Sequence, residues 1–172
     1  MKKVLILLAF GLVVCGIAAK AIAVTQSNLV PLVLYWSQER EDNYTTASEQ
    51  GGNDALASGY GYARVEACLL SSPQAGTVKL SSYWNAARGD NFTTATSVGA
   101  RSARQAGYSF TRVEGYVFAQ PRAGTIPLEL YWSQQREDNY TTGTEEGAQS
   151  ALEAGYGFAR IEGYAYPASA CQ

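Results

Sequence analysis

Tyr35-Trp-Ser-Gln-Glu-Arg-Glu-Asp-Asn-Tyr-Thr-Thr46 returns as Tyr83-Trp-Asn-Ala-Ala-Arg-Gly-Asp-Asn-Phe-Thr-Thr94 and again as Tyr131-Trp-Ser-Gln-Gln-Arg-Glu-Asp-Asn-Tyr-Thr-Thr142. Consecutive copies are 48 residues apart, and the string belongs to a repeat whose units are residues 29–76, 77–124 and 125–172. Fourteen of the 48 positions carry the same residue in all three units, without insertion or deletion. One such unit cannot bury a core alone, so the repeat predicts three units that share one interior around a threefold axis.

Each unit contains three segments with the sequence pattern of a strand. Alternating apolar residues up to the repeated tryptophan, as in Val30–Trp36, predict a first strand. The Arg-Glu-Asp-Asn segment then predicts a turn, and Gly89, which replaces a glutamate of the other units, indicates a tightly turned backbone there. Tyr44–Thr46 predicts a second strand, and Tyr108–Phe118 predicts a long final strand.

A short helix is expected between the second strand and the final strand. Residues 145–154 fit it best, with Thr144 as the N-cap and Gly155 just after the end. Three or four strands and a helix, repeated three times, predict a mainly β fold: a pseudo-threefold β-trefoil-like barrel with a short helix per repeat. A small threefold propeller or a prism-like arrangement is the alternative. Small residues on one face of the final strand, such as Gly115 and Val117, predict the crowded centre on the axis.

Residues 1–23 have the pattern of a secretory signal peptide. Lys2 and Lys3 precede an apolar run that ends at Val14, and Ala21-Ile-Ala23 is a small-residue cleavage site. We predict cleavage after Ala23 and a secreted, extracellular chain that is not held in the membrane. Lipid attachment at Cys15 is the alternative.

Residues 24–172 are long enough to form a single domain with a real core. They carry ten basic and fifteen acidic side chains, a net charge of about −5. Nucleic-acid binding depends on clustered Lys and Arg, so this balance argues against a nucleic-acid partner.

Two cysteines remain after residue 23. An exported chain favours a disulfide between Cys68 and Cys171. Cys68 stands where the other units have tyrosine, and Cys171 stands where they have alanine. Both therefore depart from the repeat, which predicts a bond that ties the last unit to the first. Two separate thiols are the alternative.

The repeated string also holds the candidate ligand-binding residues. Sugar recognition needs an aromatic ring against the C–H face of a pyranose, beside planar groups that bond neighbouring hydroxyls. One shallow site per unit is predicted, and we expect its aspartate and asparagine to be exposed in the turn. The predicted residues are Trp36, Arg40, Asp42 and Asn43, then Trp84, Arg88, Asp90 and Asn91, then Trp132, Arg136, Asp138 and Asn139. As an alternative, the tryptophans belong to the core, and the aspartates and asparagines bond local backbone in the turn.

A second repeated string, Gly-Tyr-x-[Tyr/Phe]-x-Arg-[Val/Ile]-Glu, places an arginine and a glutamate two apart on the final strand. Side chains that are two residues apart on a strand lie on the same face. We interpret Arg64 with Glu66 and their equivalents as ion pairs that support neighbouring aromatic rings. A role in ligand binding is the alternative. The equivalent pairs are Arg112 with Glu114 and Arg160 with Glu162.

The residue types present in the chain bear on several other functions. Asn43, Asn91 and Asn139 each begin Asn-x-Thr, so each is a possible N-glycosylation acceptor if the source is eukaryotic. The chain has no histidine, and Cys68 and Cys171 are predicted to pair. These two observations argue against the usual Ser-His and Cys-His nucleophiles and against most zinc sites. A single acidic turn does not provide a calcium cage. We therefore predict no enzyme activity, no cofactor and no metal.

The segment Leu80–Thr94, with the pattern Leu-x-x-Tyr-Trp-x-x-x-Arg-Gly-Asp-Asn-Phe-Thr-Thr, resembles a secreted repeat family of bacteria and fungi with a Gly-Asp-His-Phe-Tyr-Thr-Thr-like motif. Repeats of that family often accompany secreted hydrolases, so the resemblance implies carbohydrate attachment. Asn43, Asn91 and Asn139 stand where the family usually has His, and a role of that His is not carried over. In the third unit the resemblance continues at Glu146-Gly147, Gly155-Tyr156 and Glu162-Gly163-Tyr164.

These observations predict a secreted, non-enzymatic, lectin-like protein with up to three equivalent shallow sites for glycans or polysaccharide. Weak sites that are linked in one chain act together on a polymer. The alternative is a structural, self-assembling protein of an extracellular matrix or surface, whose partners are other protomers. Exposed tyrosines would suit such contacts.

Overall fold

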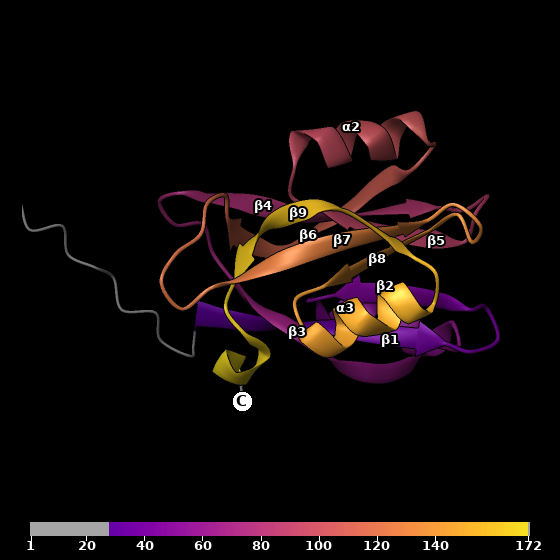
Figure 1. The fold of residues 1–172 in the computed structure, drawn as a ribbon, viewed down its shortest axis with the longest axis horizontal. Coiled ribbons are helices and arrows are strands. Elements are labelled where there is room, and N and C mark those ends of the chain that lie inside the picture. The colour runs from indigo at the N-terminus through magenta and orange to yellow at the C-terminus, as the bar shows by residue number, and fades with distance from the viewer. Residues whose placement is uncertain (1–27, 172) are drawn as a thin grey trace, which may run out of the picture.

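The computed structural model describes residues 28–171 and shows three units with the same element order, strand, strand, helix, strand (Figure 1). The predicted signal peptide, residues 1–23, and the alternative lipid site at Cys15 lie outside the described residues. Unit one contains β1 (Leu29–Ser37), β2 (Asp42–Thr46), α1 (Glu49–Ala57) and β3 (Gly61–Leu70). Unit two contains β4 (Thr77–Asn85), β5 (Asp90–Thr94), α2 (Ser97–Gln105) and β6 (Ser109–Phe118). Unit three contains β7 (Ile126–Ser133), β8 (Asp138–Thr142), α3 (Glu145–Glu153), β9 (Gly157–Ala165) and the short 3₁₀ helix η2 (Ala168–Cys171).

A mainly β structure with one short helix per unit is confirmed. In each unit the first strand pairs antiparallel with both the second and the third strand. The strands form one nine-stranded antiparallel sheet with the path β2-β1-β3-β6-β9-β7-β8, and the β4–β5 hairpin branches from β6. The long third strands meet at their ends, where Leu70 pairs with Tyr116 and Phe118 with Tyr164. An isolated bridge between Cys68 and Tyr166 makes the equivalent contact between the third and first units.

The three units share one interior. Its centre consists of equivalent positions from each unit, and Leu32, Leu80 and Leu128 are all 0% exposed. The expected crowding by small residues is present, since a Cβ on Gly163 would lie 2.5 Å from Val117 Cγ2. This central cluster also contains Ala67, Leu69, Val117 and Ala165.

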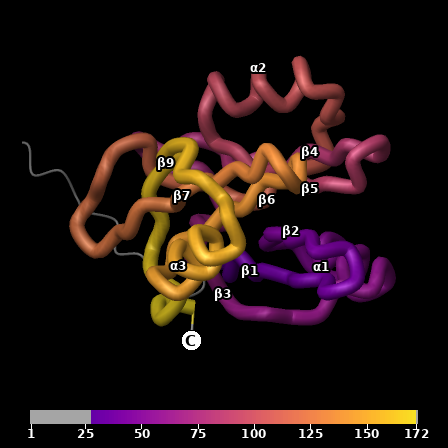
Figure 2. Tube along the Cα trace, turned by 45° about the vertical axis from the view of Figure 1, so that its right-hand side comes forward, coloured from indigo at the N-terminus to yellow at the C-terminus, as the bar shows by residue number. Residues whose placement is uncertain are grey.

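Each helix lies on the outside of its own unit, as Figure 2 shows for α1, α2 and α3. The predicted start and end of the third helix are confirmed, because Thr144 Oγ1 accepts from the Gly147 amide at 3.0 Å and Gly155 follows with φ 82°. Gly147 also has a packing role that the sequence did not indicate, since a Cβ there would lie 2.0 Å from Thr142 Oγ1. Within residues 28–171, no helix is both long enough and apolar enough to span a membrane.

The turn between the first two strands has the conformation that the sequence indicated. Glu41 and Glu137 have positive φ angles of 50° and 53°, and Gly89 takes the same place at 71°. This left-handed region costs L-residues free energy and costs glycine almost none. The tightly turned backbone predicted at Gly89 is therefore confirmed.

A glutamate in each third strand joins neighbouring units. The register of β3, β6 and β9 shifts so that Glu66, Glu114 and Glu162 have no partner in the ladder. Such a bulge turns the side chain out of the normal alternation. Each glutamate is buried and accepts a hydrogen bond from the threonine that ends the second strand of another unit. Glu162 Oε2, for example, accepts from Thr94 Oγ1 at 2.6 Å and from the Ala95 amide at 2.9 Å.

The predicted disulfide is also present. Cys68 and Cys171 are bonded, with their Cα atoms 5.9 Å apart and a sequence separation of 103 residues. The bond connects β3 of the first unit to η2 at the end of the third. It therefore ties the last unit to the first.

Candidate functional site

The short second strands β2, β5 and β8 contact one another in all three pairs, so the three units meet around a common axis. The fourth residue of each of these strands is a threonine, and the three threonines form a cyclic set of hydrogen bonds from hydroxyl to backbone carbonyl. Thr45 donates to Thr141 O, Thr141 to Thr93 O and Thr93 to Thr45 O, at 3.3–3.4 Å. This arrangement brings the first residue of each strand, an aspartate, close to its two equivalents.

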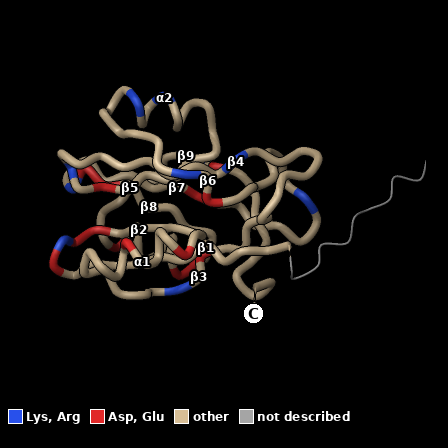
Figure 3. The backbone as a smooth tube through the Cα atoms, turned by 180° about the vertical axis from the view of Figure 1, so that it is seen from behind, with Lys and Arg blue, Asp and Glu red and all other residues tan. Residues whose placement is uncertain are grey.

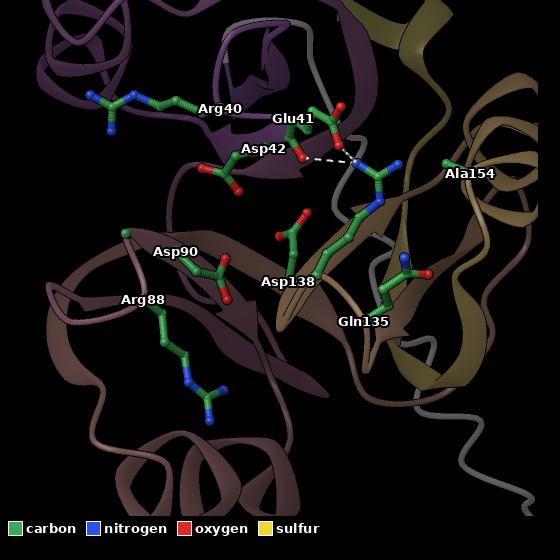
Figure 4. Close-up of a pocket in the computed structure, with 10 residues that line it drawn as sticks. Arg40, Glu41, Asp42, Arg88, Asp90, Gln135, Asp138 and Ala154 are labelled. Carbon is green, nitrogen blue, oxygen red and sulfur yellow. Dashed lines mark hydrogen bonds and ion pairs between the residues drawn. The ribbon is translucent and has the colours of Figure 1, made fainter.

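Asp42, Asp90 and Asp138 converge at one end of this axis. One carboxylate oxygen from each lies within 4.8 Å of those of the other two. Figure 4 shows the three side chains directed toward a common space. The residues are 8%, 3% and 3% exposed, respectively. We call these three residues the axial aspartates.

Tyrosine and asparagine side chains hold the Oδ2 atoms of the axial aspartates. Tyr60, Tyr108 and Tyr156 each donate a short hydrogen bond to Oδ2 of the aspartate in their own unit. Asparagines add a second donor from another unit, because Asn43 Nδ2 donates to Asp138 Oδ2 and Asn139 Nδ2 donates to Asp90 Oδ2, both at 2.9 Å. The tyrosines that follow the helices thus bind the aspartates.

The expectation of exposed aspartates and asparagines is wrong. The positions lie at the starts of strands that meet on the axis, so Asn43 is 1% and Asn139 is 8% exposed. Asn91 is half-buried. Because the amide nitrogens of Asn43 and Asn139 are buried donors, a glycan on either is incompatible with this fold.

A cavity of about 400 Å³ opens above the axial aspartates. Arg40, Arg88 and Arg136 line it, and each guanidinium lies over the ring of its own unit's aspartate-bound tyrosine at 5.6–5.9 Å. Arg136 also pairs with Glu41 at 3.1 Å. Figure 3 shows basic and acidic positions next to each other at the turn ends of β2 and β5. Among the described residues, no arginine forms a hydrogen bond or ion pair with an axial aspartate.

Burial raises the pKa of each axial aspartate. For Asp90 the pKa rises to about 7, although hydrogen bonds from Tyr108 and Asn139 oppose the shift. Burial raises the pKa of Asp138 to about 10, and repulsion from the carboxylates of Asp90 and Asp42 adds to it. The pKa of Asp42 is raised in the same direction, chiefly by burial.

These shifts predict that the protein loses stability as pH rises. In the folded state the aspartates bind more protons than in the unfolded state, so the free energy of unfolding decreases from about pH 4 through about 7 and toward about 10. Urea denaturation in EDTA at pH 5, 7 and 9 measures this. Asp138→Asn is expected to flatten the dependence, because the amide cannot ionise. Glu39→Gln, at an exposed acid of the first-unit turn, should leave it unchanged. A free energy that rises between pH 5 and 9 would contradict the assignment.

Two equivalent grooves lie between consecutive units, apart from the axial cavity. The first, about 260 Å³, joins Trp84 and Asn91 of unit two to Arg40 and Tyr44 of unit one. Asp54, Tyr60 and Arg112 also line the first groove. The second, about 340 Å³, joins Trp132, Asn139 and Arg160 of unit three to Arg88, Phe92 and Tyr108 of unit two. Each position in one set is 48 residues from its equivalent in the other. We call them the inter-unit grooves.

Side chains of the second repeated string organise these grooves. Arg112 Nη1 donates to Tyr44 Oη at 2.7 Å, and its Nη2 pairs with Asp54 at 3.1 Å. In the second groove Phe92 replaces the tyrosine, and Arg160 lies over its ring at 5.7 Å. The predicted arginine–glutamate pairs are present, at 2.8, 3.9 and 2.6 Å for units one, two and three.

The structure therefore assembles the predicted residues differently from the sequence prediction. Tryptophan and asparagine of one unit share a groove with arginine of the preceding unit, whereas the aspartates of all three units meet on the axis. The four predicted residues of one unit therefore do not meet at a single place within that unit. Tyr44, Tyr60 and Arg112 were not predicted as groove residues. Tyr60 and Arg112 belong to the second repeated string, which was interpreted as structural support, whereas Tyr44 belongs to the first string.

A family model described as a domain of unknown function, DUF5648, matches residues 23–166. The chain belongs to the DUF5648 family. The match spans all three units of this DUF5648 protein up to the end of β9. No match was found among curated proteins or among solved structures.

Proposed function

We propose that this DUF5648 protein is a secreted, non-enzymatic carbohydrate-binding protein whose sugar sites are the inter-unit grooves. The observation that carries the proposal is the composition of those grooves. Each combines a tryptophan with arginines, an asparagine and a tyrosine or phenylalanine in a space of about 260 or 340 Å³. An aromatic ring and planar hydrogen-bonding groups are what recognition of a pyranose requires.

Two features of the grooves support ligand binding over a purely structural role. Trp84 is 36% exposed although it is a large apolar side chain. In the second groove, the buried Nη2 atom of Arg160 has no hydrogen-bond partner among the described residues. A buried donor without a partner costs free energy, and a shift of the guanidinium toward a sugar hydroxyl in the groove would relieve that cost.

The repeat supports a multivalent mode of binding. The interface between units three and one carries the equivalent residues Trp36, Arg64, Arg136 and Tyr140, with Arg64 donating a hydrogen bond to the Tyr140 hydroxyl. Up to three weak sites on one rigid body would raise the avidity for a polysaccharide above that of one site. A trefoil-like barrel would hold the sites in a threefold arrangement. The disulfide supports the proposed secretion, because such bonds persist in oxidising compartments.

A glycan array followed by affinity electrophoresis in polysaccharide gels tests the proposal. Replacing Trp84 and Trp132 together by alanine should weaken binding roughly tenfold to a hundredfold, since it removes the ring from both grooves. Phe110→Ala is the matched control, because Phe110 is 57% exposed and lines neither groove. Equal loss in the control, or binding unchanged in the tryptophan variant, would rule the grooves out as sugar sites.

A second candidate function, self-assembly, rests on a different set of residues. Tyr62, Phe110 and Phe158 are equivalent positions of the repeat and are 63%, 57% and 55% exposed. Exposed aromatic rings are typical of protein–protein contacts. Light scattering of the secreted chain at increasing concentration separates the functions. Assembly that sugars do not affect and that Phe110→Ala weakens would favour self-assembly.

A further inference from the structure

We propose that the axial aspartates form a binding site for one calcium ion. The site would lie on the threefold axis, where three units each contribute one carboxylate. Carboxylate oxygens are the ligands that calcium prefers, and calcium accepts six to eight oxygens in flexible geometry. Each unit alone provides only one such ligand, which is why the sequence pattern of a single acidic turn predicted no cage.

The first support is the state of the Oδ1 atoms of two axial aspartates. Asp90 Oδ1 and Asp138 Oδ1 are buried and have no hydrogen-bond partner among the described residues. The two residues are each 3% exposed. An ionised carboxylate oxygen in that position is costly unless a cation or a donor pairs with it. Figure 4 shows the carboxylates directed into the space that they share with Asp42.

The second support is the way in which the Oδ2 atoms of the aspartates are fixed. Tyrosine hydroxyls hold Oδ2 of all three aspartates, and asparagine amides add a second donor to Asp90 and Asp138. Metal-binding carboxylates are commonly held in this way by an outer shell of donors, which orients the remaining oxygen toward the metal. The donors here occupy Oδ2 of each acid and leave Oδ1 of Asp90 and of Asp138 without a partner among the described residues.

The surroundings of the cluster allow an ion to enter and to complete its coordination. The cavity of about 400 Å³ above the aspartates is open and provides room for water ligands. Its three arginines lie over tyrosine rings, and Arg88 and Arg136 also pair with turn glutamates. Among residues 28–171, none of them forms an ion pair with an axial aspartate. A bound divalent cation would supply the missing positive charge and allow all three acids to ionise at neutral pH.

The test is a calcium titration of the purified full-length secreted protein at pH 8, followed by calorimetry and by terbium luminescence. One ion per chain is expected, with a dissociation constant of roughly 10⁻⁴–10⁻³ M, the range of extracellular calcium modules. Terbium bound there should be sensitised by the tyrosines that contact the aspartates, and calcium should displace it. Calcium should also raise the melting temperature.

Two variants and one control make the test specific. Asp138→Asn should abolish binding and the calcium-dependent rise in melting temperature, while its melting temperature in EDTA equals or exceeds that of the wild type. Tyr156→Phe should weaken binding roughly tenfold to a hundredfold through the outer shell. Glu39→Gln, an exposed acid, should bind as the wild type does. The proposal is overturned if the wild type binds no calcium below 10 mM (about tenfold above the expected range), which would mean that protons alone occupy the cluster. Unchanged binding in Asp138→Asn would also overturn it.

Discussion

Glu162→Ala is expected to lower the free energy of unfolding by roughly 3–5 kcal/mol, the range for breaking a buried ion pair or network. The Glu162 side chain is fully buried and accepts hydrogen bonds from Thr94 Oγ1 and from the Ala95 and Thr96 amides. Its other oxygen pairs with Arg160 at 2.6 Å. Alanine leaves these buried donors and the guanidinium without a partner, and each orphaned group adds its own desolvation cost. Urea denaturation at pH 7 measures the change.

Two further variants define the origin of that effect. Glu146→Ala removes an exposed acid that also pairs with an arginine, Arg64, at 3.2 Å. Surface pairs contribute about 0–1 kcal/mol, so this control should change little. Glu162→Gln keeps an acceptor but presents an NH₂ group to donors, and an intermediate loss is expected. Equal effects of Glu162→Ala and Glu146→Ala would contradict the role of Glu162 in joining units three and two.

Removal of the Cys68–Cys171 bond should have the second largest effect, a loss of roughly 2–5 kcal/mol. The bond closes a loop with a sequence separation of 103 residues, and in the chain-entropy description a loop of about 100 residues restricts the unfolded chain strongly. The double variant Cys68→Ala and Cys171→Ala should keep the far-ultraviolet spectrum of the native protein while its denaturation midpoint falls.

Reduction of the wild type should reproduce the result of the double variant. Thiol titration of the unfolded protein before and after reduction provides the control, with two thiols expected after reduction of the chain without its first 23 residues. A midpoint that is the same with and without reductant would contradict the stabilising role of the bond.

Local sequence patterns predicted the elements of each unit well. The alternation in Val30–Trp36 falls within β1, and the N-cap Thr144 and the following Gly155 bracket α3 as expected. These signals are local, because capping and alternation depend on neighbours a few residues apart. The cysteine pair was also predictable, since both residues depart from an otherwise regular repeat.

The axial aspartates were not predictable by the same reasoning. A single Asp-Asn turn indicates an exposed segment, and that expectation is correct for Glu41 next to Asp42 but wrong for Asp42 itself. The missing information was which turns lie near the axis. In a threefold body, any repeated residue near the axis meets its two copies, so the identity of the aspartate in all three units was the available signal.

The inter-unit grooves and the buried glutamates were missed for a related reason. Trp84 and Arg40 belong to different copies of the string, and only the packing of units places them at one groove. The sequence suggested that Glu162 forms an ion pair on a regular strand face. The bulge that takes it out of the strand ladder depends on the pairing of β7 with β9, which no local pattern reports.

Native-state hydrogen exchange is the most direct measurement of the central claim, that the three units form one body around the axis. The account predicts that the amides in the cores of β2, β5 and β8 exchange with the same free energy, equal to that of global unfolding, because their threonines bond one another in a cycle. Glu162→Ala should lower all three values together. One unit exchanging at a much lower free energy, while the other two remain protected, would contradict the account.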